Sequence, residues 1–294
     1  MAVLVAGVDM AISEITLVLF TTFAPSGTIA FLFMGAMSYC SRADDALRRR
    51  IDRCLYVPLV VTLAGLVMSA THLGNPSNIL YVFSRTGASP LSNEVAGAVA
   101  FLALAGVYWL QSFSRTPRLR LRTVWFAFIC VAGVAFVTLI AFAYAANTII
   151  SWNTPYVPVG LWLSALVGGP VLALASLRFA AADFVRVKIA RAMLAVSAIA
   201  LVACAACLMF QNEQLASISN ELSTAADLVP FYGEFIAMFA LLGVAGIAFM
   251  GINLHRAGKR ALVCDVASCL LVFTGIFLVR FAFYSMHLTL GLGM

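Results

Sequence analysis

Charged side chains are scarce in this chain, and the scarcity excludes whole classes of protein. They make up 10% of the 294 residues, whereas apolar residues make up 63%. A soluble domain carries about 25% charged residues and rarely exceeds about 50% apolar. A transmembrane barrel is also excluded, because its short alternating segments differ from the long continuous apolar runs found here. The composition therefore predicts an all-α membrane protein.

Eight apolar runs are long enough to cross a bilayer, which needs about 20 helical residues. They lie near 14–39, 54–71, 91–113, 123–144, 157–177, 190–210, 231–253 and 261–284. The chain lacks a tandem repeat and a low-complexity linker, so we expect one eight-helix transmembrane bundle over residues 1–294. The first run has no basic region before it and is too long for a cleaved signal peptide.

Cysteine and histidine are also used sparingly. No cysteine falls in a predicted outer loop, so no disulfide framework is implied. Cys204 and Cys207 have redox spacing but no polar neighbours, which favours small buried apolar residues. The three histidines, His72, His255 and His287, all lie at span boundaries. A di-haem subunit needs paired axial histidines at membrane depth, so we expect no haem and no metal site.

The basic residues alternate along the chain. Sixteen of the eighteen lie in four connections, at 40–53, 114–122, 178–191 and 254–260. The positive-inside rule places these connections in the cytoplasm and both termini outside, in the inner (cytoplasmic) membrane. The net charge of +6 is then a topology signal and indicates no nucleic-acid partner. The inner half of the membrane holds almost no ionisable residue, which argues against an ion channel.

The connections predicted on the outer side are longer and only weakly charged. Those at 72–90 and 211–230 exceed the usual helix connection of about 2–8 residues. Long ordered loops are typically lids, binding loops or docking surfaces. We therefore expect partners on this face.

Glu94 is the most informative single residue. It lies a few residues into the third apolar run, and His72 lies at the other end of the preceding loop. A carboxylate in a membrane span is costly, so its default interpretation is functional. The alternatives are a helix-end carboxylate, with Ser89 and Pro90 opening the helix, and a histidine bonded to loop carbonyls.

The last span repeats this pattern. Arg280, Tyr284 and His287 are spaced four and three apart, so they share one helix face near the same boundary. Their alternatives are an arginine that snorkels and a tyrosine of the interfacial aromatic belt. Their common depth favours a single cavity shared with His72 and Glu94. The segment 168–170, Gly-Gly-Pro, indicates helix packing or a kink more than a site.

Several short motifs, taken in order, resemble the membrane-anchor subunit of anaerobic dimethyl sulfoxide reductases. The similarity covers nearly the whole chain, and its most specific part is 72–94. The first span departs from the family pattern at Pro25, because this span is usually rich in Gly or Ala in that family. The segments that carry it are His72-Leu73-Gly74-Asn75-Pro76, Arg85-Thr86-Gly87-Ala88-Ser89, Leu91-Ser92-Asn93-Glu94, Gly168-Gly169-Pro170, Leu228-Val229-Pro230-Phe231-Tyr232-Gly233 and Phe283-Tyr284-Ser285-Met286-His287 with Leu288-Thr289-Leu290-Gly291.

The resemblance implies a role in anaerobic electron transport. Such an anchor oxidises menaquinol, with His72 and Glu94 at the quinol, and a neighbouring iron–sulfur subunit relays the electrons to a molybdopterin subunit. Iron–sulfur clusters and molybdopterin would then belong to the partners. Two alternatives remain: a polytopic transporter or permease, and the anchor of a related polysulfide- or nitrite-type reductase. A transporter would place polar groups nearer the bilayer midplane.

Overall fold

A computed structural model describes residues 2–40, 44–72, 81–114, 119–181 and 187–289. Within these ranges eight helical stretches are long and apolar enough to span a membrane, which confirms the all-α, eight-span prediction. Their helices are α2 (Ile15–Cys40), α3 (Asp45–Cys54) continued by α4 (Tyr56–Thr71), α6 (Pro90–Leu110), α7 (Leu119–Ala143), α8 (Tyr156–Phe179), α9 (Val187–Leu215), α11 (Tyr232–Asn253) and α12 (Lys259–Ser285).

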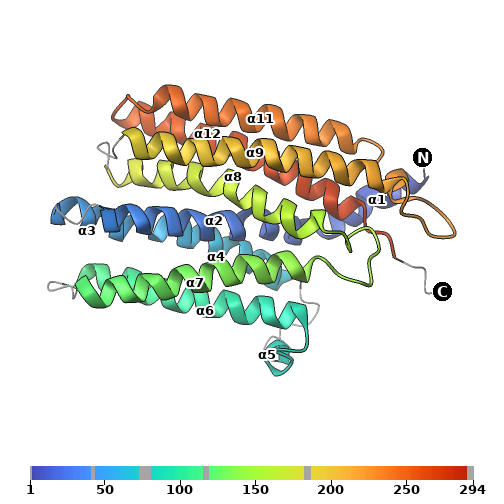
Figure 1. Cartoon of the computed structure of the whole chain (residues 1–294), viewed down its shortest axis with the longest axis horizontal. Coiled ribbons are helices and arrows are strands. Elements are labelled where there is room, and N and C mark those ends of the chain that lie inside the picture. The colour runs from blue at the N-terminus through green and yellow to red at the C-terminus, as the bar shows by residue number, and fades with distance from the viewer. Residues whose placement is uncertain (1, 41–43, 73–80, 115–118, 182–186, 290–294) are drawn as a thin grey trace.

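Short helices lie at the two ends of the bundle. At one end lie α1 (Ala2–Ser13), α5 (Tyr81–Ser84) and α10 (Ala225–Leu228), and at the other end lies α3 (Figure 1). We call these the α1 end and the α3 end. The sequence analysis did not predict α1. Gly7 lets α1 approach α10 closely, because a Cβ there would lie 2.3 Å from the Leu228 carbonyl oxygen.

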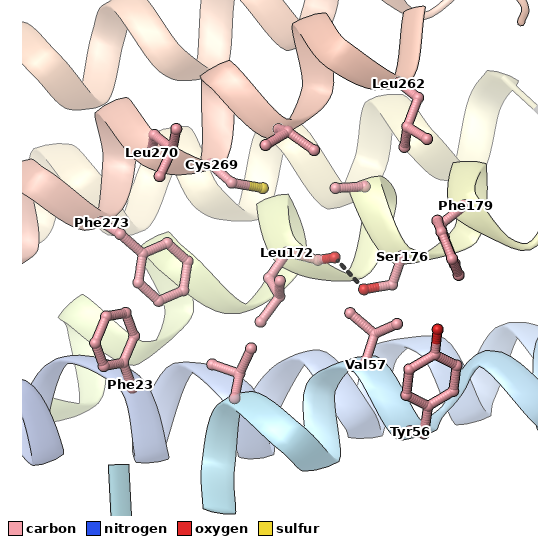
Figure 2. Close-up of a pocket in the computed structure, with 13 residues that line it drawn as sticks. Phe23, Tyr56, Val57, Leu172, Ser176, Phe179, Leu262, Cys269, Leu270 and Phe273 are labelled. Atoms are coloured by element: carbon pink, nitrogen blue, oxygen red, sulfur yellow. Dashed lines mark hydrogen bonds between the residues drawn. The ribbon is translucent and has the colours of Figure 1, made fainter. Parts of the chain in front are cut away.

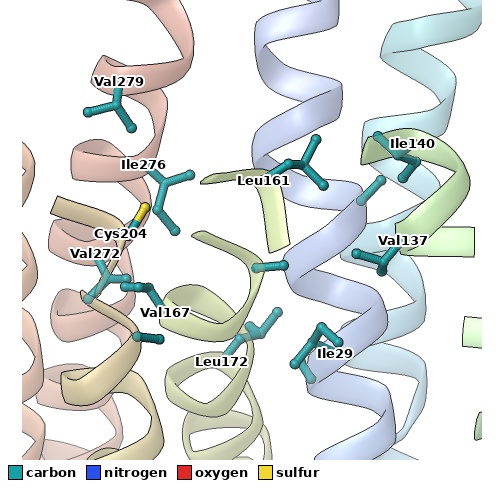
Figure 3. Packing of buried hydrophobic residues seen from close by; sticks show 14 of the residues in the cluster. Ile29, Val137, Ile140, Leu161, Val167, Leu172, Cys204, Val272, Ile276 and Val279 are labelled. Carbon is teal, nitrogen blue, oxygen red and sulfur yellow. The ribbon is translucent and has the colours of Figure 1, made fainter. Parts of the chain in front are cut away.

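Helices α2 and α8 form the centre of the bundle. In each, 72% of the membrane-spanning stretch is buried, the largest share among the eight spans. Figure 1 shows α9, α11 and α12 on one side of this pair and α4, α6 and α7 on the other. A Cβ on Gly169 would lie 2.4 Å from Ile29 Cγ2, so glycine is what brings α8 against α2. Ile29 and Leu161 belong to the apolar cluster that fills this centre (Figure 3).

Pro25 lies inside α2 and does not end it. The helix runs from Ile15 to Cys40, and Pro25 is buried in its middle. Proline removes one intrahelical hydrogen bond, and a helix tolerates this when its neighbours hold it in place. Pro25, where the resembled family usually has a Gly- or Ala-rich span, is therefore accommodated within the most buried pair of helices.

The α3 end contains buried charges that the sequence analysis underestimated. Asp52 pairs with Arg122 at 2.9 Å, and Asp265, near the start of the last predicted span, pairs with Arg178. Asp265 also accepts a hydrogen bond from the Asn253 side chain at 2.7 Å. Only Asp265 of these four residues falls within a predicted span, so the buried pairs lie at the inner boundary of the bundle. These partners come from different helices, so sequence distance hides them.

Candidate functional site

A cavity of about 420 Å³ opens at the α1 end of the bundle and contains both of the leading candidate residues. His72 comes from the end of α4 and Glu94 from the first turns of α6. Apolar side chains from α2, α4, α6 and α7 make up most of the remaining wall; the other lining residues are Leu17, Leu66, Ser69, Ala70, Val82, Leu91, Val95, Ala98, Val99, Leu102, Ala143 and Tyr144. Such a cavity suits a largely apolar molecule with a few polar groups.

Glu94 is positioned by the start of α6. Pro90 occupies the first helical position and Ser89 precedes it, as predicted, although the Ser89 side chain makes no capping hydrogen bond. The Asn93 side chain instead accepts a hydrogen bond from Gly87 N–H at 2.6 Å, which closes the turn before the helix. Gly87 has φ of +91°, a conformation that glycine adopts without strain.

The carboxyl group of Glu94 is buried and incompletely bonded. The residue is 1% exposed, and its Oε2 has no hydrogen-bond partner among the described residues. Buried polar groups nearly always have such a partner. An unsatisfied acceptor at the wall of a cavity is therefore a place where a ligand hydroxyl can donate.

His72 ends α4, and its ring is paired with Glu14. The His72 Nε2 atom lies 3.2 Å from Glu14 Oε2, at the junction between α1 and α2. Glu14 was not among the residues that the sequence singled out. Its proximity to His72 depends on how α2 packs against α4, so no local pattern could have revealed the pair.

Tyr144 is a second site residue that sequence analysis missed. It lines the cavity just beyond the end of α7, within electrostatic range of both Glu94 and Glu14. Its ring centroid lies 5.8 Å from that of Tyr284, which is fully buried. Tyr284 therefore stands behind Tyr144 and does not line the cavity. A tyrosine at the boundary of a span was the only signal available in the sequence.

Arg280 lies apart from the cavity, deeper in the other side of the bundle. It is 6% exposed and donates a hydrogen bond from Nη2 to Ser164 Oγ at 2.7 Å. With Gln211 and Tyr232 it borders a separate void of about 10 Å³. Tyr232 donates a hydrogen bond to the Gln211 side chain at 3.2 Å. Arg280 is thus fixed inside the bundle and does not snorkel to the surface.

His287 follows the end of α12 and is half-buried. Its ring packs edge-to-face on Trp152, with centroids 5.0 Å apart. The expectation that all five predicted residues share one cavity therefore does not hold. His72 and Glu94 share it, Tyr284 contacts it through Tyr144, and Arg280 and His287 lie outside it. The predicted common helix face holds for Arg280 and Tyr284 of α12, whereas His287 follows the end of that helix.

A second, larger cavity of about 490 Å³ lies between α4 and α12 (Figure 2). Phe23 and Phe273 stack at one end of it, with ring centroids 5.6 Å apart. The Ser176 hydroxyl, one of two hydroxyl groups at its wall with that of Tyr56, is already bonded to the Leu172 carbonyl at 2.8 Å. Among the described residues, no Asp, Glu, His, Lys or Arg lines it, so these residues offer this cavity no carboxylate, imidazole or basic side chain for chemistry.

The arrangement at the first cavity is suited to proton transfer. A carboxyl group and an imidazole can each accept a hydrogen bond or a proton from a hydroxyl-bearing ligand. The apolar wall would hold the body of such a ligand. Within the described residues no cluster of three or more acidic, histidine or cysteine side chains could hold a metal ion.

The bundle and its cavity define a polytopic membrane protein with a candidate polar site at the α1 end. Within that class, the model of the DMSO reductase anchor subunit family (DmsC) matches residues 8–286, and the chain belongs to this family. The "Anaerobic dimethyl sulfoxide reductase chain YnfH" of Escherichia coli (strain K12) is 30% identical over 279 residues, covering 95% of this chain and 96% of the relative.

Two further relatives are C subunits of anaerobic dimethyl sulfoxide reductases by name. That of Escherichia coli (strain K12) is 30% identical over 281 residues. That of Haemophilus influenzae (strain ATCC 51907 / DSM 11121 / KW20 / Rd) is 28% identical over 280 residues. Each alignment covers 95% of this protein and 96% of the relative, so the similarity extends over the whole bundle.

Proposed function

We propose that this membrane anchor binds and oxidises a quinol in the cavity lined by His72 and Glu94. It then passes the electrons to the iron–sulfur subunit of a molybdopterin reductase complex in the inner membrane. The observation that carries the proposal is the Glu94 carboxyl group, which is 1% exposed and has an unpartnered Oε2 at the wall of an apolar cavity. Family membership supports the same role.

The chemistry of a quinol matches the residues at this wall. Oxidation breaks two O–H bonds and releases two protons and two electrons, which leaves the quinone. Glu94 accepts the hydrogen bond and then the proton of one hydroxyl, and His72 stands at the same wall for the other. Apolar residues of α6, among them Val95 and Val99, hold the ring and the start of the isoprenoid tail. We take menaquinol as the quinol of this anaerobic system.

The position of the cavity favours an iron–sulfur partner bound at the α1 end. His72 and Glu94 lie at the α1 end, whereas His255 follows α11 at the α3 end. Electron tunnelling falls steeply with distance, so the nearest cluster belongs at the α1 end, and not across a core of about 30 Å. The connections there are 72–90, 145–156 and 211–230. On the charge-derived topology this face is the outer one, and labelling of partner subunits in intact spheroplasts tests that orientation.

The decisive experiment replaces Glu94 with glutamine in the assembled complex. Glu94→Gln keeps the shape of the side chain and removes the base, so we expect quinol-dependent turnover to fall about 100-fold or more. Turnover driven by a soluble artificial donor, which reaches the partner subunits directly, should persist. The measurement is the ratio of the two activities in the same membranes.

A matched control is available on another helix. Glu234 lies in the first turn of α11, also at the α1 end, but is exposed. Glu234→Gln should leave both activities unchanged. If Glu94→Gln retained quinol-dependent turnover as well, Glu94 would be a helix-end carboxylate and the proposed function of this cavity would be wrong.

A further inference from the structure

We propose that Glu14 is a positioning residue that holds His72 and carries protons from the cavity to the water at the α1 end. This inference rests on the proposed quinol function and adds to it the path taken by the protons. Glu14 lies outside the cavity wall and acts through His72. No local motif around Glu14 indicates this role, and the tertiary contact alone reveals it.

Both groups on this path are far more exposed than the Glu94 carboxyl group at the cavity wall. The Glu94 residue is 1% exposed, whereas the side chains of Glu14 and His72 are 22% and 42% exposed. His72 both lines the cavity and reaches the surface. A proton that leaves a buried quinol can thus reach water through one imidazole and one carboxylate.

The contact with Glu14 places one ring nitrogen of the imidazole beside the carboxylate. Because His72 Nε2 faces Glu14 Oε2 at 3.2 Å, the other ring nitrogen, Nδ1, is free of this contact. A histidine accepts a proton at one nitrogen and releases a proton from the other, which makes it a natural relay. Nδ1 can take the quinol proton while Nε2 gives its own to Glu14.

The surroundings of Glu14 come from four elements. His72 faces it from the end of α4, and Tyr144 and His287, which follow α7 and α12, lie within electrostatic range. Glu14 itself joins α1 to α2. Its ion-pair partner among the described residues is His72, whose imidazole can both accept and release a proton. A lysine or arginine partner would have held the carboxylate permanently ionised and unable to relay.

The step balances with the quinol as the reductant. One O–H bond of the quinol breaks as its proton moves to His72, and an N–H bond at Nε2 breaks as a proton moves to Glu14 and then to water. The second quinol proton goes to Glu94. The two electrons go to an iron–sulfur cluster of the partner subunit, which is the oxidant.

The test uses Glu14→Gln in the intact complex, with two readouts. We expect kcat for quinol to fall about tenfold with little change in KM, because the cavity wall is untouched while proton release slows. Added acetate, a small diffusible base, should restore part of the lost rate by taking over the carboxylate's role. Glu14→Asp, which keeps a carboxylate, should retain more activity than Glu14→Gln.

Controls distinguish a failure of this proton path from a failure of the proposed quinol function. Asp9 is an exposed acid on α1, so Asp9→Asn should be neutral, and soluble-donor activity reports assembly for every variant. A normal kcat in Glu14→Gln, or a lost rate that acetate cannot restore, would overturn the proton path while leaving the proposed function intact. The proposed function fails separately, if Glu94→Gln retains quinol turnover.

Discussion

Asp52 and Arg122 form an ion pair of 2.9 Å at the α3 end, opposite the candidate site. Asp52 also accepts a hydrogen bond from Ser38 at 2.6 Å, and the Arg122 guanidinium lies 4.4 Å from the centroid of the Tyr108 ring. The cluster joins α2, α3, α6 and α7. It therefore ties together the side of the bundle that also builds the cavity.

Removing one member of this pair should destabilise the protein strongly. Arg122→Ala leaves Asp52 as an uncompensated charge in a site where its side chain is 1% exposed. Breaking a buried ion pair in this way costs about 3–5 kcal/mol. Thermal unfolding of the purified protein in detergent measures the loss. Arg120 lies on the same helix but is exposed, so Arg120→Ala should leave the unfolding temperature nearly unchanged.

A pair of glycines tests how α8 packs against α2. A Cβ on Gly169 would lie 2.4 Å from Ile29 Cγ2, whereas no atom lies within 4 Å of a Cβ on Gly106 in α6. Gly169→Ala should cost about 1–3 kcal/mol through overpacking. Gly106→Ala should cost nothing. The double variant Gly169→Ala with Ile29→Ala should recover part of the loss; no recovery would locate the strain elsewhere.

Filling each of the two apolar cavities in turn tests which of them binds the quinol. Ala98 lines the Glu94 cavity and Ala175 lines the cavity between α4 and α12. Ala98→Phe should fill the first cavity and raise the KM for quinol by about tenfold or more, since it removes apolar binding volume. Ala175→Phe should leave quinol kinetics unchanged. The reverse result in steady-state assays would move the quinol to the second cavity.

His287 should make the protein less stable in mild acid. Burial of its ring lowers its pKa below the ordinary value of 6.5. The unfolded chain therefore binds a proton more readily than the folded one, and stability is lost as pH falls through about 6.5. Above that pH both states are neutral and the effect vanishes. The unfolding temperature of His287→Gln should fall less between pH 8 and pH 5 than that of the wild type.

Much of the architecture was predictable because hydrophobicity is a local property. A bilayer demands about 20 apolar residues per helix, so run length alone located the eight spans. The first span was predicted near 14–39 and is found at Ile15–Cys40. The short helix α1 was not predicted, since its end-of-bundle position depends on contacts with α10 and α12 and not on its own length. Glu94 stood out because a carboxyl group is costly at that depth in any fold.

The sequence by itself thus determined the membrane class, the spans and the presence of polar residues at one end of them. Only the tertiary structure decided which of those residues meet. Arg280 and Tyr284 lie on one face of α12, yet Arg280 bonds Ser164 of α8 while Tyr284 packs on Tyr144. Glu14 meets His72 across 57 intervening residues. Helical periodicity fixes which way a side chain points, whereas its partner depends on helix packing, which small residues such as Gly169 set.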